Sequence, residues 1–179
     1  SRHGVLDLAQ SLDHVGPLTR CSADAGIVLQ AIAGRDANDP TSLTAPVPGM
    51  LSGLETGAKG LRIGWDERYG SDDLTSDHAA AVSAAVEVMA GLGAEIIPVS
   101  MPERLAEYLP AWIVLCTAEA ADAHQDTYPS RADEYGPWFR EWLARGHGFS
   151  AADYAEANNL RAACVGGLRQ TMADVDLLA

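Results

Sequence analysis

Five histidines, one lysine and one Asp-His pair are the residues of this chain with the clearest potential for chemistry. The histidines lie at positions 3, 14, 78, 124 and 147, without a His-x-His pair or an HExxH run, so their spacing predicts no metal site. Asp13 and His14 are adjacent, but neighbours in an extended segment point to opposite faces, and we interpret them as support for the turn at Gly16. Spacing alone leaves a Ser-His-Asp triad open, yet no G-x-S-x-G elbow presents a serine. These residues predict neither a metal nor a cofactor.

The composition is that of a folded protein. The chain has 179 residues, 47% hydrophobic and 21% charged, which is enough for one domain with a core. A formal net charge of −13 would repel nucleic acid and anionic membranes, so we expect neither as a partner. No apolar run approaches the length of a membrane span. Cys21, Cys116 and Cys164 form no CxxC pair, and we expect reduced, buried thiols in a cytoplasmic protein.

The first 34 residues must position the Asp-His pair. Val15-Gly16-Pro17 predicts a short extended piece, because a residue before proline is pushed towards the β region. Ser22 can cap a helix that runs to Gly34, with Asp24 in its first turn. The apolar residues three and four apart predict one buried helix face, made of Ala25, Leu29 and Ile32.

Residues 35–60 are rich in Pro, Gly, Ser and Thr and predict a surface connection rather than a domain boundary.

Residues 61–99 predict a βαβ unit with parallel strands at 61–65 and 95–99. Gly93 ends the helix between them, which runs over about 77–92. We expect its inner face to consist of Val82, Val86 and Met89. Because no GxGxxG follows the first strand, this unit is not predicted to bind a dinucleotide.

Residues 102–172 predict a helical cover. One helix runs to about His124, and a second spans about 134–144. The first of them has its inner face at Leu105, Leu109, Trp112, Cys116, Ala120 and Ala123. A third helix starts at Ser150, with Asp153 completing a capping box. Its inner face is predicted at Tyr154, Ala157, Arg161, Cys164 and Leu168. Residues 174–179 predict a short strand.

Several motifs of the first 42 residues, with their spacing, together resemble the amidase signature family. They are Ser1-Arg2-His3-Gly4, the run from Ser11 to Arg20, Asp24-Ala25, Ala31-Ile32-Ala33-Gly34, Asp36 and Asp39-Pro40-Thr41-Ser42. The resemblance implies an α/β fold with a mixed central sheet covered by helices. It covers nearly all of residues 1–179, which are similar to the middle of such an enzyme. We therefore expect one partial domain, an internal fragment in which residues 1–34 end the signature core.

The resemblance also implies a reaction. In this family a neutral lysine is the base, a serine with a cis peptide bond relays the proton, and a second serine attacks the amide. Backbone N–H groups of a Gly-Ser loop bind the oxyanion. Lys59, the only lysine, matches the approach to a strand and not the catalytic lysine, and no Gly-Gly-Ser-Ser-Gly run is present. We therefore assign no catalytic residue within the chain and expect all three upstream of Ser1.

Supporting roles can be carried over from the family. Arg2 matches the end of the strand after the catalytic loop and is expected to fix that loop, with a plain surface arginine as the alternative. Asp13 and Gly16 match the family's turn under the same sheet. Substrate contacts are expected from the helical cover, at Arg140, Tyr154 and Arg161. For Arg140, a solvated charge is an equal alternative.

The resemblance predicts an enzyme that hydrolyses a small carboxylic amide to an acid plus ammonia or an amine. The family implies no metal and no organic cofactor, and a homodimer is one assembly open to it. A second hypothesis is the A subunit of the glutamyl-tRNA amidotransferase, which uses glutamine as its ammonia donor. A third is a non-catalytic α/β binding module, because these residues carry no nucleophile with its base.

Overall fold

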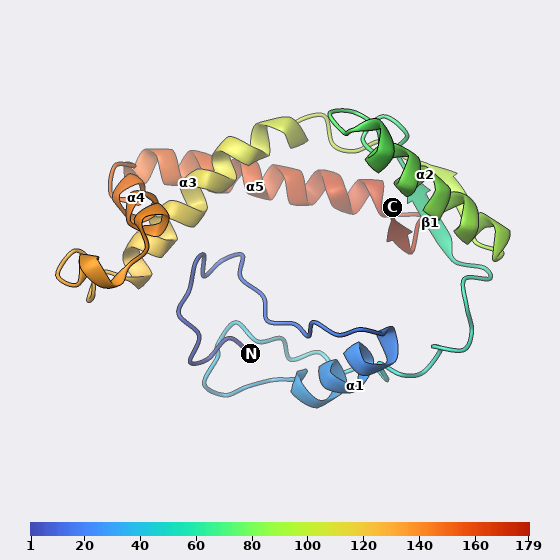
Figure 1. Cartoon of the computed structure of the whole chain (residues 1–179), viewed down its shortest axis with the longest axis horizontal. Coiled ribbons are helices and arrows are strands. Elements are labelled where there is room, and N and C mark those ends of the chain that lie inside the picture. Colours follow the sequence, from blue (N-terminus) through green and yellow to red (C-terminus); the bar gives the residue numbers. More distant parts are fainter. The chain divides into compact units, whose positions relative to one another are not determined.

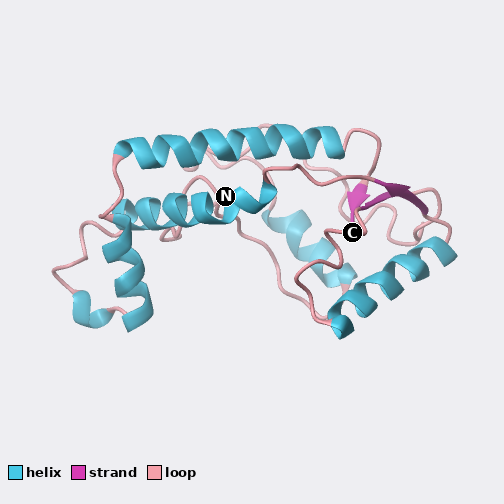
Figure 2. Cartoon of the chain, turned by 90° about the horizontal axis from the view of Figure 1, so that it is seen from above, coloured by secondary structure: helices cyan, strands magenta, loops and turns pink.

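The computed structural model describes residues 1–179 and divides them into two compact units. Unit 1 comprises Ser1–Glu55 and Trp112–Glu156, and unit 2 comprises Thr56–Ala111 and Ala157–Ala179. Figure 1 labels the α-helices and β1, and Figure 2 colours all elements by type. They are α1 (Ser22–Ile32), β1 (Arg62–Trp65), α2 (Ser76–Gly91), β2 (Glu95–Pro98), α3 (Leu105–Ala123), η1 (Ala132–Glu134), α4 (Pro137–Gly146), α5 (Ala151–Thr171) and β3 (Leu177–Leu178). The chain therefore has an α/β fold, as predicted.

Unit 2 is built on a small parallel sheet with the strand order β2-β1-β3 (magenta in Figure 2). β1 pairs with β2 in the register Ile63 to Ile96, and with β3 in the register Ile63 to Leu177. Ile63 is only 3% exposed, because it lies on the central strand. The predicted βαβ unit and the predicted C-terminal strand are both confirmed.

The helix of the βαβ unit packs through the predicted face. Val82, Val86 and Met89 of α2 are half-buried, whereas most of the helix is exposed. Gly93 has φ +95°, a conformation that favours glycine, and it follows the end of α2 as predicted. The turn brings the chain back so that Glu95 N–H donates to the Leu61 carbonyl at 2.8 Å, which starts the pairing of β2 with β1.

The core of unit 1 lies where α4 meets the C-terminal part of α3. Leu115 and Leu143 are fully buried. The rings of Trp112 and Trp142 meet edge to face with their centroids 6.1 Å apart. Gly146 lets α4 approach α3 closely. A Cβ at this position would lie 1.9 Å from the Thr117 carbonyl oxygen. Only glycine allows the backbones to approach so closely.

The start of α5 follows the predicted capping box. Ser150 N–H donates to the Asp153 carboxylate at 2.8 Å, and Asp153 N–H donates to the Ser150 hydroxyl at 3.2 Å. The hydroxyl of Ser150, followed by its N–H, lowers the pKa of Asp153. All five residues of the predicted inner face are buried or half-buried, so the helical spacing is confirmed.

Several details of the prediction are wrong. The N-cap of α1 is Cys21 rather than Ser22. On the predicted inner face of α1, Ala25 and Leu29 are half-buried, but Ile32 is 46% exposed. Leu109 of α3, predicted on the inner face, is 63% exposed. The half-buried residue of that turn is Tyr108 instead. α4 begins at Pro137, where proline suits the first helical turn, and not at 134. Cys116 and Cys164 are buried as expected, but Cys21 is exposed.

Residues 35–60 form turns without a helix or strand, as predicted. That this connection is not a domain boundary stays a prediction. Measured by length and hydropathy together, none of the helices qualifies as a membrane span.

Candidate functional site

The first fifteen residues form no helix or strand and are held in place by side chains. Arg2 makes three such links. Its N–H donates to Asp39 Oδ2 at 2.8 Å, and its guanidinium donates to Thr41 Oγ1 at 2.7 Å and to the Gln10 carbonyl. Arg2 therefore ties the N-terminal segment to the loop at residues 36–42, which contains the Asp-Pro-Thr-Ser motif.

Asp39 is the acceptor at the centre of this loop and is 7% exposed. Its Oδ1 accepts the Thr41 hydroxyl at 2.6 Å and the Thr41 N–H at 2.9 Å. These bonds, led by the Thr41 hydroxyl and followed by Arg2 N–H, hold the pKa of Asp39 well below its usual range. Asp36 accepts the Ser1 hydroxyl at 2.7 Å, which lowers its pKa as well. Both carboxylates are thus held in the charged form.

Asp13 closes a neighbouring turn. Its Oδ2 accepts Leu8 N–H at 2.8 Å and Ala9 N–H at 3.0 Å, while Asp13 N–H donates to the Ala9 carbonyl at 2.8 Å. Ala9 is only 1% exposed, so its N–H needs this partner. His14 is exposed and places Nδ1 2.6 Å from the Leu12 carbonyl oxygen. Asp13 therefore supports residues 8–13, and no bond joins it to His14.

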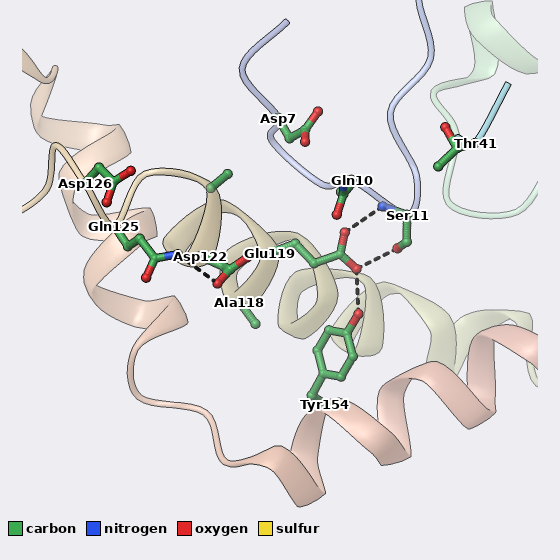
Figure 3. A pocket seen from close by; sticks show the side chains of 11 residues that line it. Asp7, Gln10, Ser11, Thr41, Ala118, Glu119, Asp122, Gln125, Asp126 and Tyr154 are labelled. Atoms are coloured by element: carbon green, nitrogen blue, oxygen red, sulfur yellow. Dashed lines mark hydrogen bonds between the residues drawn. The ribbon is translucent and has the colours of Figure 1, made fainter. Parts of the chain in front are cut away.

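A groove of about 790 Å³ opens in unit 1 beside these segments. Most of its lining residues have polar side chains. They come from the N-terminal segment, the loop at residues 36–42, α3, the chain after α3 and the start of α5 (Figure 3). The labelled lining residues are Asp7, Gln10, Ser11, Thr41, Ala118, Glu119, Asp122, Gln125, Asp126 and Tyr154. The groove thus combines carboxylates with hydroxyl and amide groups, which both donate and accept hydrogen bonds.

Glu119 lies at the centre of the bonded part of the groove (Figure 3). Its Oε2 accepts Ser11 N–H at 2.7 Å, and its Oε1 accepts the Ser11 hydroxyl at 2.6 Å. The same Oε1 accepts the Tyr154 hydroxyl at 2.8 Å. Glu119 therefore joins α3 both to the Ser11-Leu12-Asp13 motif and to the first turn of α5.

The predicted substrate contacts lie in different places. Tyr154 lines the groove of unit 1. Arg140 is exposed on α4, and Arg161 is half-buried on the part of α5 that belongs to unit 2, where Nε donates to Asn158 Oδ1 at 3.2 Å. Neither arginine lines the groove. Gly16 is exposed, and a Cβ there would meet no atom within 4 Å. The roles of these residues, and those of Arg2 and Asp13, stay predictions.

Sequence reasoning assigned no role to Glu119, Ser11, Asp39 or Thr41. Glu119 could have been noticed as a carboxylate three residues after Cys116, and therefore close to the predicted inner face of a mostly apolar helix. The bond between Asp39 and Thr41 had a local signal in the Asp-Pro-Thr-Ser sequence of residues 39–42. An Asp two residues before a Thr favours a local side-chain hydrogen bond. The pairing of Ser11 with Glu119 had no local signal.

No group of three or more His, Cys, Asp or Glu side chains is arranged to hold a metal ion. Cys116, next to the groove on α3, is a poor nucleophile, because burial, followed by the charge of Glu119, raises the pKa of its thiol to about 11. The arrangement therefore offers positioned carboxylates, hydroxyls and amides, and no assembled catalytic set.

Comparison with known proteins gives consistent matches. The family described as Amidase matches residues 1–179. The protein AmiD of Mycobacterium tuberculosis, which is named as an amidase, is 38% identical over 179 residues, covering 99% of this chain and 37% of its own length. The A subunit of the glutamyl-tRNA(Gln) amidotransferase of Gloeobacter violaceus is 44% identical over 121 residues, covering 68% of this chain and 24% of its own length.

Among solved structures, one described as a crystal structure of amidase is 26% identical, with a TM-score of 0.78. The match covers 99% of this chain and 37% of the solved one. The chain thus spans little more than a third of the length of the proteins that it matches over nearly all of its residues.

Proposed function

The chain belongs to the amidase family, and from this premise we propose that it forms part of an enzyme that hydrolyses small carboxylic amides. The products are an acid and ammonia or an amine, formed through an acyl-enzyme. The observation that carries the proposal is the family match over residues 1–179, and the 38% identity with AmiD supports it. The nucleophilic serine, the cis-serine and the lysine base belong to residues outside these 179.

In this proposal the side-chain network of unit 1 supports the catalytic loop. Arg2, Asp13 and Gly16 are the buttress residues. The links from Arg2 to Asp39, Thr41 and Gln10 support such a role, because they fix the backbone at both ends of the N-terminal segment. A rigid segment can hold the oxyanion donors in position. Donors held in this way lower the activation barrier of amide hydrolysis.

Tyr154, Arg140 and Arg161 are proposed to contact the substrate. For Tyr154 the support is its place in the groove, where Glu119 holds its hydroxyl. For the two arginines the support is the family resemblance alone. The proposed enzyme is cytoplasmic, and a homodimer is one assembly that light scattering would test.

The natural protein that carries these 179 residues provides the test. We expect it to release ammonia from benzamide and propionamide, and the isolated chain to release product at the buffer rate. A natural protein inactive on simple amides, anilides and glutamine would contradict the proposal. So would turnover by the isolated chain that a single Ser→Ala change within residues 1–179 abolishes.

Arg2→Ala in the natural protein tests the buttress role. We expect it to lower kcat more than it changes KM, because the positioning of oxyanion donors acts in the transition state. Wild-type kinetics in a stably folded Arg2→Ala variant would contradict the buttress role and favour the alternative, in which Arg2 is a plain surface arginine. Arg20→Ala, at an exposed arginine just before α1, is the matched control.

The amidotransferase A subunit is the second candidate function, because the Gloeobacter protein is 44% identical over 68% of the chain. Ammonia release from glutamine, coupled to amidation of glutamyl-tRNA in the presence of the other components of that enzyme, would favour it. Release from simple amides without such components would favour the free-standing amidase.

A further inference from the structure

Glu119 accepts three hydrogen bonds in the groove of unit 1. We propose that Glu119 is a positioning residue, which fixes Ser11 and the phenol of Tyr154 on the groove wall so that Tyr154 meets the substrate in one orientation. The role of Tyr154 as a substrate contact rests on the proposed function. The positioning of Ser11 and Tyr154 stands on the contacts alone.

The geometry restricts what Glu119 can do. A carboxylate has two oxygens and accepts only, and here Oε2 takes Ser11 N–H while Oε1 takes the two hydroxyls. The two bonds from Ser11, 2.7 Å from its N–H and 2.6 Å from its hydroxyl, are as short as charge-assisted bonds, and the bond from the Tyr154 hydroxyl, at 2.8 Å, has the ordinary length of an O–H···O bond. Three donors from two distant segments therefore converge on one side chain.

The position of Glu119 makes this convergence effective. It lies on α3 beside the fully buried Ala120, within a turn of the buried Cys116, so its backbone is fixed by the core of unit 1. Ser11, by contrast, belongs to a segment without regular structure and is 108 residues away in the chain. The rigid helix thus supplies a fixed acceptor, and the irregular segment and the ring of Tyr154 adjust to it.

Glu119→Gln is the informative substitution. Glutamine has the same shape but only one accepting oxygen, whereas Ser11 N–H and the two hydroxyls bond to different oxygens of Glu119. In the variant one side of the group must face an NH₂ donor, and the other side bonds to a neutral amide oxygen, which is a weaker acceptor than a carboxylate. Asp122→Asn is the matched control. It removes the same charge from the same groove and helix, but Asp122 bonds Gln125 at 3.3 Å, not Ser11 or Tyr154.

The first readout is independent of activity. In the natural protein, we expect Glu119→Gln to speed hydrogen exchange of the Ser11 amide about tenfold or more, because local protection follows local stability. Asp122→Asn should leave that exchange rate unchanged. Equal exchange rates in wild type and Glu119→Gln would overturn the positioning role, whether or not the protein is an amidase.

The second readout is kinetic. We expect Glu119→Gln to lower kcat/KM for an amide substrate about 10- to 100-fold, the size typical of a misplaced binding group. If Glu119 acts through Tyr154, the double variant with Tyr154→Phe should lose little more than the larger single loss. Additive losses, or a Glu119→Gln enzyme as active as Asp122→Asn, would overturn the positioning of Tyr154 for substrate. An inactive wild-type protein would instead contradict the proposed function and leave the exchange measurement to decide.

Discussion

Each of the two units is stabilised internally by a different kind of interaction. Unit 2 contains the sheet, and its strands are joined by backbone hydrogen bonds that any residue except proline can supply. The N-terminal part of unit 1 has no strand, and the side chains of Arg2, Asp13, Asp39 and Glu119 make its links. A segment fixed by particular side chains tolerates few substitutions. The motifs that identify the family accordingly lie mostly in unit 1.

The largest expected effect tests the helix packing on which unit 1 depends. Gly146→Ala should destabilise the natural protein by about 3 kcal/mol, at or above the upper end of overpacking costs, because the new Cβ would lie 1.9 Å from the Thr117 carbonyl and backbone must move. Thermal unfolding measures the loss. Gly166→Ala in α5 is the control, since nothing lies within 4 Å of its Cβ, and it should stabilise by up to about 1 kcal/mol.

The next effect tests whether side chains hold the N-terminal segment. Asp13→Ala leaves the N–H groups of Leu8 and Ala9 without their acceptor, which should cost about 1–3 kcal/mol. Asp13→Asn should lose much less, because both N–H groups bond to the same Oδ2, which an amide oxygen can replace. Urea titration of both variants checks this. Equal stability of Asp13→Ala and wild type would show that the segment is held by other means.

The same contrast explains what the sequence could predict. The βαβ unit was predictable, because its strands and helix follow one another within forty residues and the pairing needs no distant partner. The capping box at Ser150 and the inner face of α5 were predictable for the same reason, since residues three or four apart meet on one helix. The family resemblance came from the motifs of residues 1–42.

The misses concern contacts between distant residues. Periodicity placed Ala25, Leu29 and Ile32 on one face of α1, but it does not say how far another surface covers that face. Ala25 and Leu29 are half-buried, whereas Ile32 at the end of the helix is exposed. The roles of Glu119 and Ser11 depend on a fold that brings together residues 108 positions apart. The links from Arg2 to Thr41 and Asp39 have the same origin.

A smaller effect compares the two units through pH. Arg62, whose side chain and N–H bond Asp176 in unit 2, lowers the pKa of Asp176 to about 2. Asp39 in unit 1 has its pKa held well below the usual range by the Thr41 hydroxyl first. A carboxyl group whose folded pKa is depressed contributes stability above its unfolded pKa of about 4, and this stability is lost as pH falls towards the folded value.

We therefore expect the melting temperature of the natural protein to fall between about pH 4 and pH 2. Asp176→Asn should reduce the steepness of this fall. Asp39→Asn should reduce it as well, over a range that extends to lower pH, because the Asp39 carboxylate stays charged to lower pH. Glu55→Gln, which removes one charge at an exposed carboxylate, corrects for net charge. Identical pH profiles of Asp39→Asn and Glu55→Gln would contradict the role of Asp39.

The smallest effect concerns the exposed ion pair between Arg104 and Glu107 at the start of α3. Nη2 lies 2.7 Å from Oε2, but the two side chains are 60% and 54% exposed. Water and salt screen such pairs, and holding two long side chains costs entropy, so Glu107→Gln should change stability by less than about 0.5 kcal/mol. The measurement is a urea titration at low and at high salt, in which the variant should track the wild type. A loss as large as that of Asp13→Ala would contradict the contrast between the units, because an exposed local pair would then stabilise the chain as much as the links that close an irregular segment.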